Sequence, residues 1–572
     1  MNTELPAKPT FETELEPQTE TVSEPEEEIK TISPRQTLIT DQTWASICNI
    51  AEEIMEKTAE ALPTMSIGSE LTFFSMVDLD LSSEDKQERL RDHAQELMQR
   101  LKEKFAPNSR IQVKKRLGTY KLEWKVKSRG KFSYQIFLGE ECLKVHPPKT
   151  DTWPELDTYI SGLFDAAYET GLSADKFNGN GIPHGTGEGS KIIISGLEEE
   201  ISPFLQRPDL LLSLATYWQN HPSLSYLFSG QNAGPMGPAP RADEVRNDIH
   251  YEMEIASRFI PLPGRGKMPP EIIDQMFRHI LTDRSGDPGK GEIAIDQLHP
   301  VEAPERQLGL VILRCFEMVP DPRLHLLQIL IVRAIMARLA TDPYREKCVK
   351  WRSALQNEFM LPYFLEVDYK NVLLDLEDYG YKFQSHWFAA QVARRFPPLG
   401  TVTLDDVDLD LSLAIEPLNT HYDPHADSII QPPQLQRLQL KTAHLDPDRH
   451  IVTCNGFIVP LTEPDENTIQ VAAIRLYKNL PQLPSGAVMK RTPNKLTFEL
   501  VDKETKASLG GFLFIIPTPE EYRRISMTCD PIEARHRRNA SFDPFIPYGG
   551  EVFVHPSPRT PESPHVLDMR II

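Results

Sequence analysis

The pattern of hydrophobic residues changes near residue 398, and this change constrains the fold more than any other feature of the chain. Before it, helix-like and strand-like segments are mixed without strict alternation, which is typical of an α+β fold. After it, segments such as TVTLDDVDLDLSL, LQRLQLKTAHL and KLTFELVD are short, alternating and separated by turn residues, as in a β-sandwich or barrel. The sequence therefore predicts an α+β domain over residues 39–398 and a β-rich, sandwich-like domain over residues 399–572.

The first 38 residues differ from both predicted domains. They carry nine glutamates among prolines and threonines, with few apolar residues and no periodicity. This composition is typical of a disordered acidic tail. After it, Trp44, Ile47 and Ile54 fall on one helical face, and Asp41 stands where a helix cap is expected. We therefore expect a first helix from about residue 41 to about residue 62.

The most apolar stretch of the chain runs from residue 324 to residue 339. Gln328, Arg333 and Arg338 interrupt it. Its length of roughly 16 residues is also short of the roughly 20 that a membrane-spanning helix needs. We therefore expect a core helix, and the pattern predicts another helix after it that contains Tyr344 and Trp351.

Charge and cysteine content exclude several classes of function. The formal net charge of -21 would repel a nucleic-acid backbone and an anionic membrane surface alike, so we expect neither as a partner. The six cysteines are scattered without a C-x-x-C pair, which argues against a zinc ribbon and a disulfide framework. The chain opens with acidic residues and no hydrophobic leader segment, so the sequence predicts a cytoplasmic protein.

A glycine-rich loop, GTGEGSK, occupies residues 185–191. Closely spaced glycines let backbone N–H groups converge on a phosphate, and the final lysine adds positive charge. The loop is not a Walker A motif, because Gly189, Ser190 and Lys191 open a predicted strand rather than a helix. The alternative is a structural turn at the start of that strand.

Several glutamates lie inside predicted strands, where a carboxylate that faces a cavity can hold magnesium. They are Glu70, Glu123, Glu292 and Glu317. The alternative for each is a side chain that points to solvent from a half-buried sheet. Arg314 is also placed in an apolar strand, so it needs an anionic partner: Glu317, another carboxylate or a bound phosphate.

Seven stretches, in the same order along the chain, resemble a bacterial amidoligase family of the glutamine synthetase-like carboxylate–amine ligases. They are GTGEGSKIIISG, LATYWQNHPSLSYLFSG, APRADEVRNDIHYEMEIA, LGLVILRCFEM, FMLPYF, HIVTCNGF and LVDKETKASLGG. The resemblance implies a glutamine synthetase-like α+β domain followed by a β-rich region. Family members often carry a transglutaminase-like domain upstream, whose place is taken here by the acidic tail and the strands before residue 150.

The resemblance also implies a reaction. ATP activates a carboxylate as an acyl phosphate, an amine attacks it, and magnesium bridges the phosphates to sheet carboxylates. The implied nucleotide-binding residues are Gly185, Thr186, Gly187, Gly189 and Lys191. The implied magnesium ligands are Glu70, Glu123 and Glu292, and the implied catalytic residues are Arg314 and Arg246. The partners would be a small-molecule or peptide carboxylate and an amine.

Five positions depart from the family pattern where metal and nucleotide are expected. The family has Asn-His where Ser190 and Lys191 stand, and glutamate where Ile312 stands. It has arginine at Gln307 and glutamate at Cys142. Because a protonated lysine cannot ligate a metal, these changes predict a divergent ligase with impaired catalysis. The alternative is a non-catalytic paralogue that acts as a binding partner or scaffold.

Overall fold

The computed structural model describes most of the chain after the acidic tail. The described ranges are 36–76, 83–107, 112–116, 119–123, 134–139, 141–186, 188–197, 202–246, 248–418, 435–477, 494–517, 525–544, 550–557 and 563–570. The side chains of residues 83–84, 112–116, 119–123 and 477 lie outside the description. Residues 1–35 of the predicted tail also lie outside the described residues.

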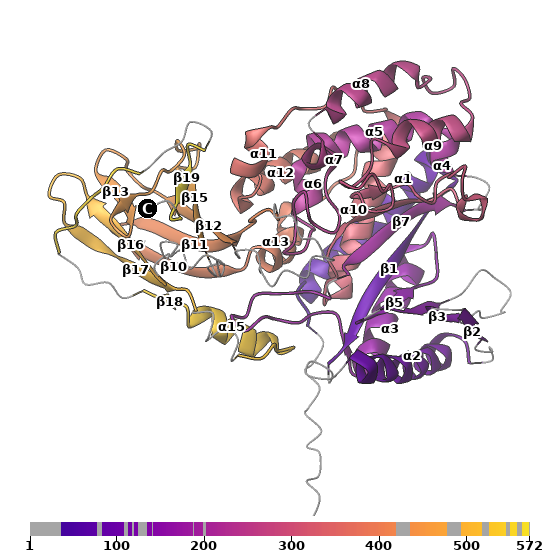
Figure 1. The fold of residues 1–572 in the computed structure, drawn as a ribbon, viewed down its shortest axis with the longest axis horizontal. Coiled ribbons are helices and arrows are strands. Elements are labelled where there is room, and N and C mark those ends of the chain that lie inside the picture. The colour runs from indigo at the N-terminus through magenta and orange to yellow at the C-terminus, as the bar shows by residue number, and fades with distance from the viewer. Residues whose placement is uncertain are drawn as a thin grey trace, which may run out of the picture. The chain divides into compact units, whose positions relative to one another are not determined.

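Helices dominate the described part up to residue 395 (Figure 1). They are α1 (Asp41–Ala61), α2 (Ser83–Phe105), α3 (Trp153–Glu169), α4 (Pro203–Gln206), α5 (Pro208–Asn220), α6 (Pro222–Tyr226), α7 (Ala242–Val245), α8 (Ile249–Phe259), α9 (Pro270–Arg278), α10 (Pro322–Thr341), α11 (Ser353–Asn357), α12 (Pro362–Asp378) and α13 (Ala389–Arg395), with 3-10 turns η1 (Pro304–Arg306) and η2 (Ser385–Phe388). One further helix, α15 (Pro531–Asn539), belongs to the C-terminal part.

One large antiparallel sheet accompanies these helices. Its strands are β1 (Met65–Ser75), β2 (Gln112–Arg116), β3 (Thr119–Glu123), β4 (Gln135–Leu138), β5 (Leu143–His146), β6 (Leu172–Ser173), β7 (Ser190–Gly196), β8 (Ile293–Ala294) and β9 (Val311–Phe316). Their order is β2-β3-β4-β5-β1-β7-β9-β8, and β6 pairs with β1. Every pairing is antiparallel, which is incompatible with a doubly wound parallel sheet. The predicted α+β fold class is confirmed.

Helices cover one face of this sheet. Phe73 of β1 packs edge-on against Phe164 of α3, with ring centroids 5.3 Å apart. Ser69 of the same strand contacts His325 of α10, with Oγ and Nε2 separated by 2.9 Å. Because side chains alternate along a strand, the even-numbered residues of β1, including Glu70, point to the opposite face. That opposite face is the open face of the sheet.

Helix α10 is the core helix that the sequence predicts. It is long and apolar enough to meet the criteria for a membrane span, but most of it is buried inside the protein. It packs against α1, α3 and α5. The helix α1 begins as expected, although Thr40 rather than Asp41 caps it: the Thr40 Oγ1 accepts a hydrogen bond from the backbone N–H of Thr43 at 3.3 Å.

The helix predicted around Tyr344 and Trp351 does not form. Residues 343–350 have no regular structure, and α11 begins only at Ser353. The backbone here bonds to a neighbouring helix instead of to itself: Asn220 of α5 donates to the Lys347 carbonyl (3.0 Å) and accepts from the Val349 N–H (2.8 Å). A side-chain amide that bonds both groups of an extended segment replaces the helical hydrogen bonds.

After residue 397 the chain forms two five-stranded sheets. One contains β10 (Pro398–Leu404), β11 (Val407–Ala414), β12 (Leu435–Ala443), β15 (Gln470–Tyr477) and β19 (Val566–Asp568). The other contains β13 (His450–Cys454), β14 (Phe457–Ile458), β16 (Lys495–Asp502), β17 (Ser508–Ile515) and β18 (Phe542–Asp543). Leu409 and Leu438 of the first sheet share one buried cluster with Phe498 and Phe512 of the second, so the two sheets form a sandwich.

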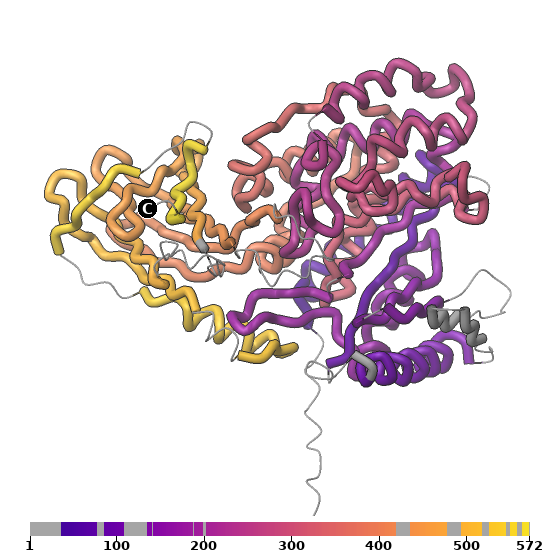
Figure 2. Tube along the Cα trace, in the orientation of Figure 1, coloured from indigo at the N-terminus to yellow at the C-terminus, as the bar shows by residue number. Residues whose placement is uncertain are grey.

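In Figure 2 the trace runs, in order of residue number, from the helices and the large sheet to the two sheets of the sandwich. Strand β10 begins at Pro398, the position where the sequence pattern changes. The segment TVTLDDVDLDLSL is a hairpin of two strands, β10 and β11, rather than one strand. Asp405 and Asp406 form its turn with positive φ angles of 48° and 62°. The division into three parts at residues 38 and 398 stays a prediction.

Candidate functional site

The open face of the large sheet carries the charged residues that the sequence singles out. Glu70 of β1 lies opposite Lys191 of β7 in the antiparallel register. On the next strand, Leu313 of β9 belongs to the helix-covered core, so its neighbour Arg314 points to the open face. The sheet thus brings Glu70, Lys191 and Arg314 to one side, on three adjacent strands.

Glu70 is held between two basic side chains. Its Oε1 accepts a hydrogen bond from Lys191 Nζ at 2.5 Å, and its Oε2 accepts one from His146 Nε2 at 2.8 Å. Burial alone would raise the pKa of Glu70, but the hydrogen bond from His146 and the charge of Lys191 outweigh it and lower the pKa to about 2. Glu70 is therefore ionised at neutral pH, with both oxygens engaged by the protein itself.

A cavity of about 90 Å³ opens beside this cluster, and we call it the Arg314 cavity. Its charged lining residues are His184, Glu188, Lys191, Arg241, Glu244, Arg314 and Glu317. Gly189 and Gly230–Gly234 form parts of its wall. The cavity therefore combines three carboxylates with three Lys or Arg side chains and a glycine-rich wall.

Two of the three cations are already used by the protein. Lys191 pairs with Glu70. Arg241 is 1% exposed and donates from Nε and Nη2 to both oxygens of Asp243, at 3.0 and 2.9 Å. Its Nη1 donates to Ser225 Oγ at 2.9 Å. Neither cation is available to a ligand without breaking these bonds.

Arg314 is different. Its Nη1 donates to the carbonyl of Gly289 at 2.6 Å, and within the described ranges no carboxylate oxygen lies within 4 Å of its guanidinium. Burial lowers the pKa of Arg314, although Asp296 and Glu70 act in the opposite direction at longer range. A half-buried guanidinium without a paired carboxylate favours an anionic ligand. The sequence allowed an ion pair with Glu317, and the structure does not form it.

Glu317 forms the wall between the Arg314 cavity and a smaller cavity of about 20 Å³. Its Oε1 accepts from the Met318 N–H at 2.9 Å, and burial raises the pKa of Glu317. Two glycines make room for the carboxylate: a Cβ on Gly185 would lie 2.5 Å from Oε1, and one on Gly230 would overlap Oε2. Gly185 also has a φ of +66°, which disfavours any other residue.

The smaller cavity is lined by a second cation, Arg395, that forms no ion pair within 4 Å in the part of the chain that the structure describes. Arg395 is 4% exposed and donates from Nε to the Tyr226 carbonyl at 3.1 Å, while its buried Nη2 has no hydrogen-bond partner. Burial lowers the pKa of Arg395 to about 10, although the nearby charge of Glu317 raises it. Its neighbour Arg394 pairs with the buried Asp175. Cations on either side of Glu317 thus face cavities.

A buried polar network lies behind the Arg314 cavity. Glu244 accepts from the Tyr226 hydroxyl at 2.6 Å, and Glu292 accepts from Gln219 Nε2 at 2.8 Å. Burial raises the pKa of both carboxyl groups to about 7, against the charge of the nearby Arg241. The Oε2 of Glu292 has no hydrogen-bond partner. This network holds Arg241 in place, and its two carboxyl groups, Glu244 and Glu292, can each lose a proton near neutral pH.

The predicted nucleotide loop lies at the mouth of the Arg314 cavity. Thr186 Oγ1 contacts Thr72 Oγ1 at 2.6 Å, and Thr72 Oγ1 donates to the Gly189 carbonyl at 2.6 Å, so the loop is fastened to β1. Gly189 and Lys191 line the Arg314 cavity, and Gly185 lines the smaller one. Gly187 lies outside the described residues. The structure therefore brings this loop and Arg314 together.

Arg246, the other predicted catalytic residue, does not line either cavity. It follows α7, and its Nη2 donates to Glu252 Oε2 at 2.5 Å and to the His279 carbonyl at 2.9 Å. Arg241, five residues earlier, occupies the cavity wall instead. The catalytic role of Arg246 stays a prediction, with no contact to the Arg314 cavity in its support.

The three predicted magnesium ligands are not gathered into one cluster. Glu70 is bound by Lys191 and His146, and Glu292 lies in the network behind the cavity. Glu123 ends β3, and its side chain lies outside the described residues. Over the described residues, no group of three or more His, Cys, Asp or Glu side chains could hold a metal ion. The metal assignment stays a prediction.

The positions that the sequence analysis expects to depart from the family pattern contact other parts of the protein. Ile312 packs with Ile193 and Ala294 in a small apolar cluster on the open face. Cys142 is fully buried, and burial raises its pKa to about 12. Gln307 donates to the Pro300 carbonyl at 3.0 Å. An ammonium group at Lys191, an apolar side chain at Ile312 and a protonated thiol do not fit a magnesium ion.

Three cavity residues were not predicted as site residues: Glu188, Glu244 and Arg241. Glu188 belongs to the glycine loop, so its position in the sequence could have marked it as a site residue. In the structure it pairs with Lys144 at 2.8 Å. Glu244 and Arg241 reach the cavity through a short helix after the Gly/Pro-rich passage, which no periodic pattern reveals. Glu317 was predicted as a strand carboxylate and as a possible partner of Arg314, although simple alternation places a residue three positions after Arg314 on the opposite face.

A mixed α+β chain with this cavity on an antiparallel sheet can be compared with known families. Residues 142–570 match the profile of the family described as "Putative amidoligase enzyme". The match covers about three quarters of the chain, and the chain belongs to this family. A comparison with curated proteins found no match. Family membership in an amidoligase group is confirmed, and the name indicates formation of amide bonds.

Proposed function

We propose that this chain is a divergent, glutamine synthetase-like carboxylate–amine ligase, with residues 39–398 as its ligase domain. The Arg314 cavity would bind the phosphate-bearing part of ATP or of an acyl phosphate. The observation that carries this proposal is the state of the three cavity cations. Lys191 and Arg241 are paired with carboxylates, whereas Arg314 has none within 4 Å in the described part of the chain.

The reaction of such a ligase assigns a role to each side of the cavity. Arg314 would stabilise the negative charge of the transferring phosphoryl group, next to the N–H groups of the glycine loop. Glu317, whose pKa is raised by burial, would accept a proton from the incoming ammonium group. The amine would then attack the acyl carbon, the bond from that carbon to the phosphate oxygen would break, and inorganic phosphate would leave. The substrates are a carboxylate and an amine, and the free cysteines are in line with a cytoplasmic location.

Magnesium does not fit the residues at the Glu70 position, so no step of this proposal passes through it. The ammonium group of Lys191 stands 2.5 Å from Glu70 and supplies one positive charge at the place where the family pattern has a metal-ligating side chain. Loss of one metal contribution is typically worth several kcal/mol in transition-state stabilisation, or orders of magnitude in rate. We therefore propose weak or absent magnesium-dependent turnover of ATP.

Calorimetric titration with ATP in excess EDTA tests the binding part of this proposal. The wild-type chain is expected to bind, and Arg314→Gln is expected to bind about 10- to 100-fold more weakly, because a charge-assisted hydrogen bond is lost. Arg265→Gln is the matched control, since Arg265 is exposed and lines neither cavity, and it should bind as the wild type does. Equal affinity of the wild type and Arg314→Gln, or no binding by either, would contradict the proposal.

The second candidate is a non-catalytic partner protein that keeps the ligase fold. The same pairing of Lys191 with Glu70 favours it, because that ion pair removes one predicted metal ligand. Binding of ATP that Arg314→Gln weakens distinguishes the two, since a scaffold that does not use the cavity would bind no nucleotide.

A further inference from the structure

A ridge of exposed hydrophobic side chains runs along α8, on residues that do not line the Arg314 cavity. Tyr251, Ile255 and Phe259 are 58%, 55% and 68% exposed. They are spaced four residues apart, so they lie on one side of the helix and form a continuous apolar strip about 12 Å long. We call these three residues the α8 ridge. Large apolar side chains gathered on a surface mark a binding site for another molecule.

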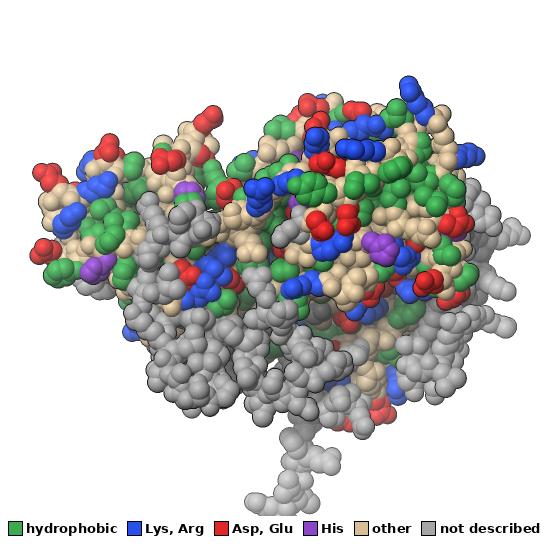
Figure 3. All heavy atoms as spheres, turned by 45° about the horizontal axis from the view of Figure 1, so that its top comes forward, with side chains coloured by type: hydrophobic (Ala, Val, Ile, Leu, Met, Phe, Trp, Pro, Cys, Tyr) green, Lys and Arg blue, Asp and Glu red, His purple; other side chains and the backbone are tan. Residues whose placement is uncertain are grey.

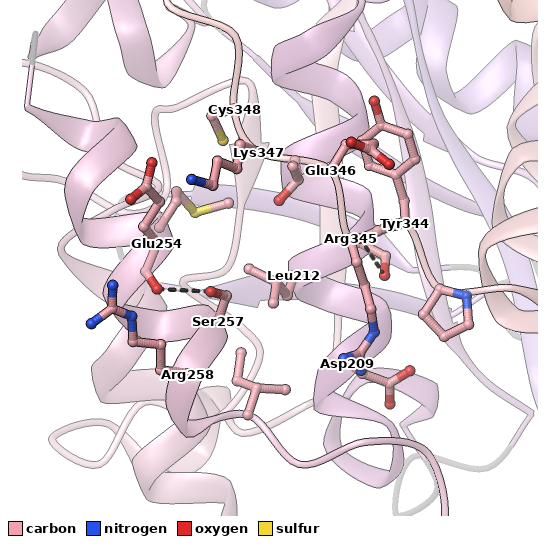
Figure 4. A pocket seen from close by; sticks show the side chains of 15 residues that line it. Asp209, Leu212, Glu254, Ser257, Arg258, Tyr344, Arg345, Glu346, Lys347 and Cys348 are labelled. Carbon is pink, nitrogen blue, oxygen red and sulfur yellow. Dashed lines mark hydrogen bonds between the residues drawn. The ribbon is translucent and has the colours of Figure 1, made fainter.

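A groove of about 260 Å³ runs beside the α8 ridge (Figure 4). Met253, Glu254, Ser257, Arg258 and Ile260 form one wall, and residues 343–348 form the other. Leu212 and Thr216 of α5 lie at its floor. The extended segment 343–348 that replaces the predicted helix therefore creates this groove. Its size suits one or two side chains of a partner segment.

The groove itself is lined by three cations and by three carboxylates, Asp209, Glu254 and Glu346, but the two segments that flank it carry an excess of cations although the protein is acidic. Residues 251–270 and 343–352 contain seven Lys or Arg and three Glu residues, in a chain of net charge -21. In the described part, Arg258, Arg345 and Lys347 at the groove have no ion pair within 4 Å, whereas Glu252 is paired with Arg246. Figure 3, which turns the top of Figure 1 forward, shows Lys and Arg side chains among hydrophobic ones on this face.

Lys350, which follows the second wall of the groove in the sequence, contacts the α8 ridge. Its Nζ lies 4.0 Å from the centre of the Tyr251 ring, a cation–π contact that leaves the other ring face open. Val349 beside it is 40% exposed. Lys350 and Val349 therefore place a cation and an apolar side chain next to the α8 ridge.

We propose that the α8 ridge and its groove bind an acidic amphipathic helix of a partner protein. Apolar side chains of that helix, spaced three or four residues apart, would pack on Tyr251, Ile255 and Phe259, and its carboxylates would pair with the flanking cations. A second copy of this chain would bring the same seven cations against each other, which opposes association. An anionic membrane would be repelled by the net charge of the rest of the chain.

The test uses the full chain and a fluorescein-labelled helical peptide with Leu at every third or fourth position and Glu at the others. The same peptide with Lys in place of Glu is the charge control. Fluorescence anisotropy is expected to show binding of the Glu peptide, and at least about tenfold weaker binding of the Lys peptide. Tyr251→Ser/Ile255→Ser/Phe259→Ser is expected to weaken binding of the Glu peptide by at least about tenfold.

Val367→Ser/Leu374→Ser is the matched control, because these residues of α12 are 42% and 58% exposed but lie on another helix. It should bind the Glu peptide as the wild type does, and circular dichroism should show that both variants are folded. No binding of the Glu peptide, or equal binding by the folded triple variant, overturns the proposal. Dimers that the triple variant dissociates, or binding to vesicles of phosphatidylcholine and phosphatidylserine that it abolishes, would also overturn it.

Discussion

At the scale of single residues, the glutamates shielded from solvent around the Arg314 cavity differ in whether folding favours their ionised or their protonated form. Glu70 has two basic partners and a pKa lowered to about 2, so folding favours its charged form. Glu292 has a neutral donor, Gln219, and a pKa raised to about 7, so folding favours its protonated form. Burial raises the pKa of both carboxyl groups, but at Glu70 the bonds and charges of His146 and Lys191 outweigh it, whereas at Glu292 burial dominates.

Glu292→Gln should make the protein more stable at high pH. The folded chain holds the Glu292 proton up to about pH 7, whereas the unfolded chain releases it near the ordinary value of 4.5. Stability therefore falls as pH rises between these two values. Glutamine keeps the acceptor for Gln219 and cannot ionise, so the variant should gain roughly 2–4 kcal/mol over the wild type at pH 8.

Urea unfolding at pH 4.5 and at pH 8 measures this difference. At pH 4.5 the wild type and Glu292→Gln should have nearly the same free energy of unfolding. Glu305→Gln, at an exposed position, is the control and should not change the pH dependence. A Glu292→Gln variant that is less stable than the wild type at both pH values would contradict the assignment of a protonated Glu292.

Single residues were predictable where the sequence itself shows a conflict. Arg314 stands out because a cation in an apolar strand needs a partner, and the structure places it in a cavity where, among the described residues, no carboxylate oxygen lies within 4 Å of its guanidinium. The packing of the Glu317 carboxylate against Gly185 and Gly230 could not be predicted, because these two glycines come from separate loops that only the folded chain brings together. The ion pair of Glu70 with Lys191 likewise depends on strand register, which composition does not determine.

At the scale of elements, the glycine loop and β9 fit each other closely. Gly185→Ala should destabilise the protein more than Gly286→Ala. Both glycines have positive φ, +66° and +82°, but only the Gly185 Cβ would meet another group, Glu317 Oε1 at 2.5 Å. The backbone cost of about 1 kcal/mol is common to both, and the collision adds roughly 1–3 kcal/mol for Gly185→Ala.

Free energies of unfolding from urea titrations compare the two variants. The account expects Gly185→Ala to lose clearly more stability than Gly286→Ala, and to weaken ATP binding because Glu317 and the loop shift. Equal losses in the two variants would show that the carboxylate moves freely and that the loop does not fix its position.

Elements with a strong hydrophobic periodicity were predicted from the sequence. Elements whose conformation depends on contacts with another part of the chain were not. Helix α10 follows directly from its apolar period. The segment 343–350 has a helical pattern but bonds to Asn220 instead, so tertiary contacts override its local preference. The turn of the β10–β11 hairpin was missed because Asp405 and Asp406 take positive φ in a segment that otherwise alternates without a break.

At the scale of the whole molecule, the change of pattern near residue 398 corresponds to a change of architecture. The large antiparallel sheet draws its strands from residues 65–316, and the two sheets of the sandwich draw theirs from residues 398–568. The fold class could be predicted because it depends on patterns summed over many residues. The site could be predicted only in part, because it depends on contacts between single residues of distant loops.

The central claim is that the Arg314 cavity binds a phosphate-bearing ligand while Lys191 occupies the place of a metal. Two changes together should restore a magnesium site: Lys191→His removes the ammonium group from Glu70, and Ile312→Glu adds a carboxylate on the adjacent strand of the open face. Lys191→His/Ile312→Glu is expected to bind ATP more tightly in magnesium than in EDTA, and either change alone should do little.

The most direct measurement is the affinity of the wild-type chain for ATP, by calorimetry, in excess magnesium and in excess EDTA. The account predicts dissociation constants that agree within about threefold, because Arg314 and the glycine loop supply the contacts. An affinity that magnesium raises by about tenfold or more, accompanied by hydrolysis of ATP in the wild-type chain, would contradict it and return the protein to the magnesium-dependent ligases.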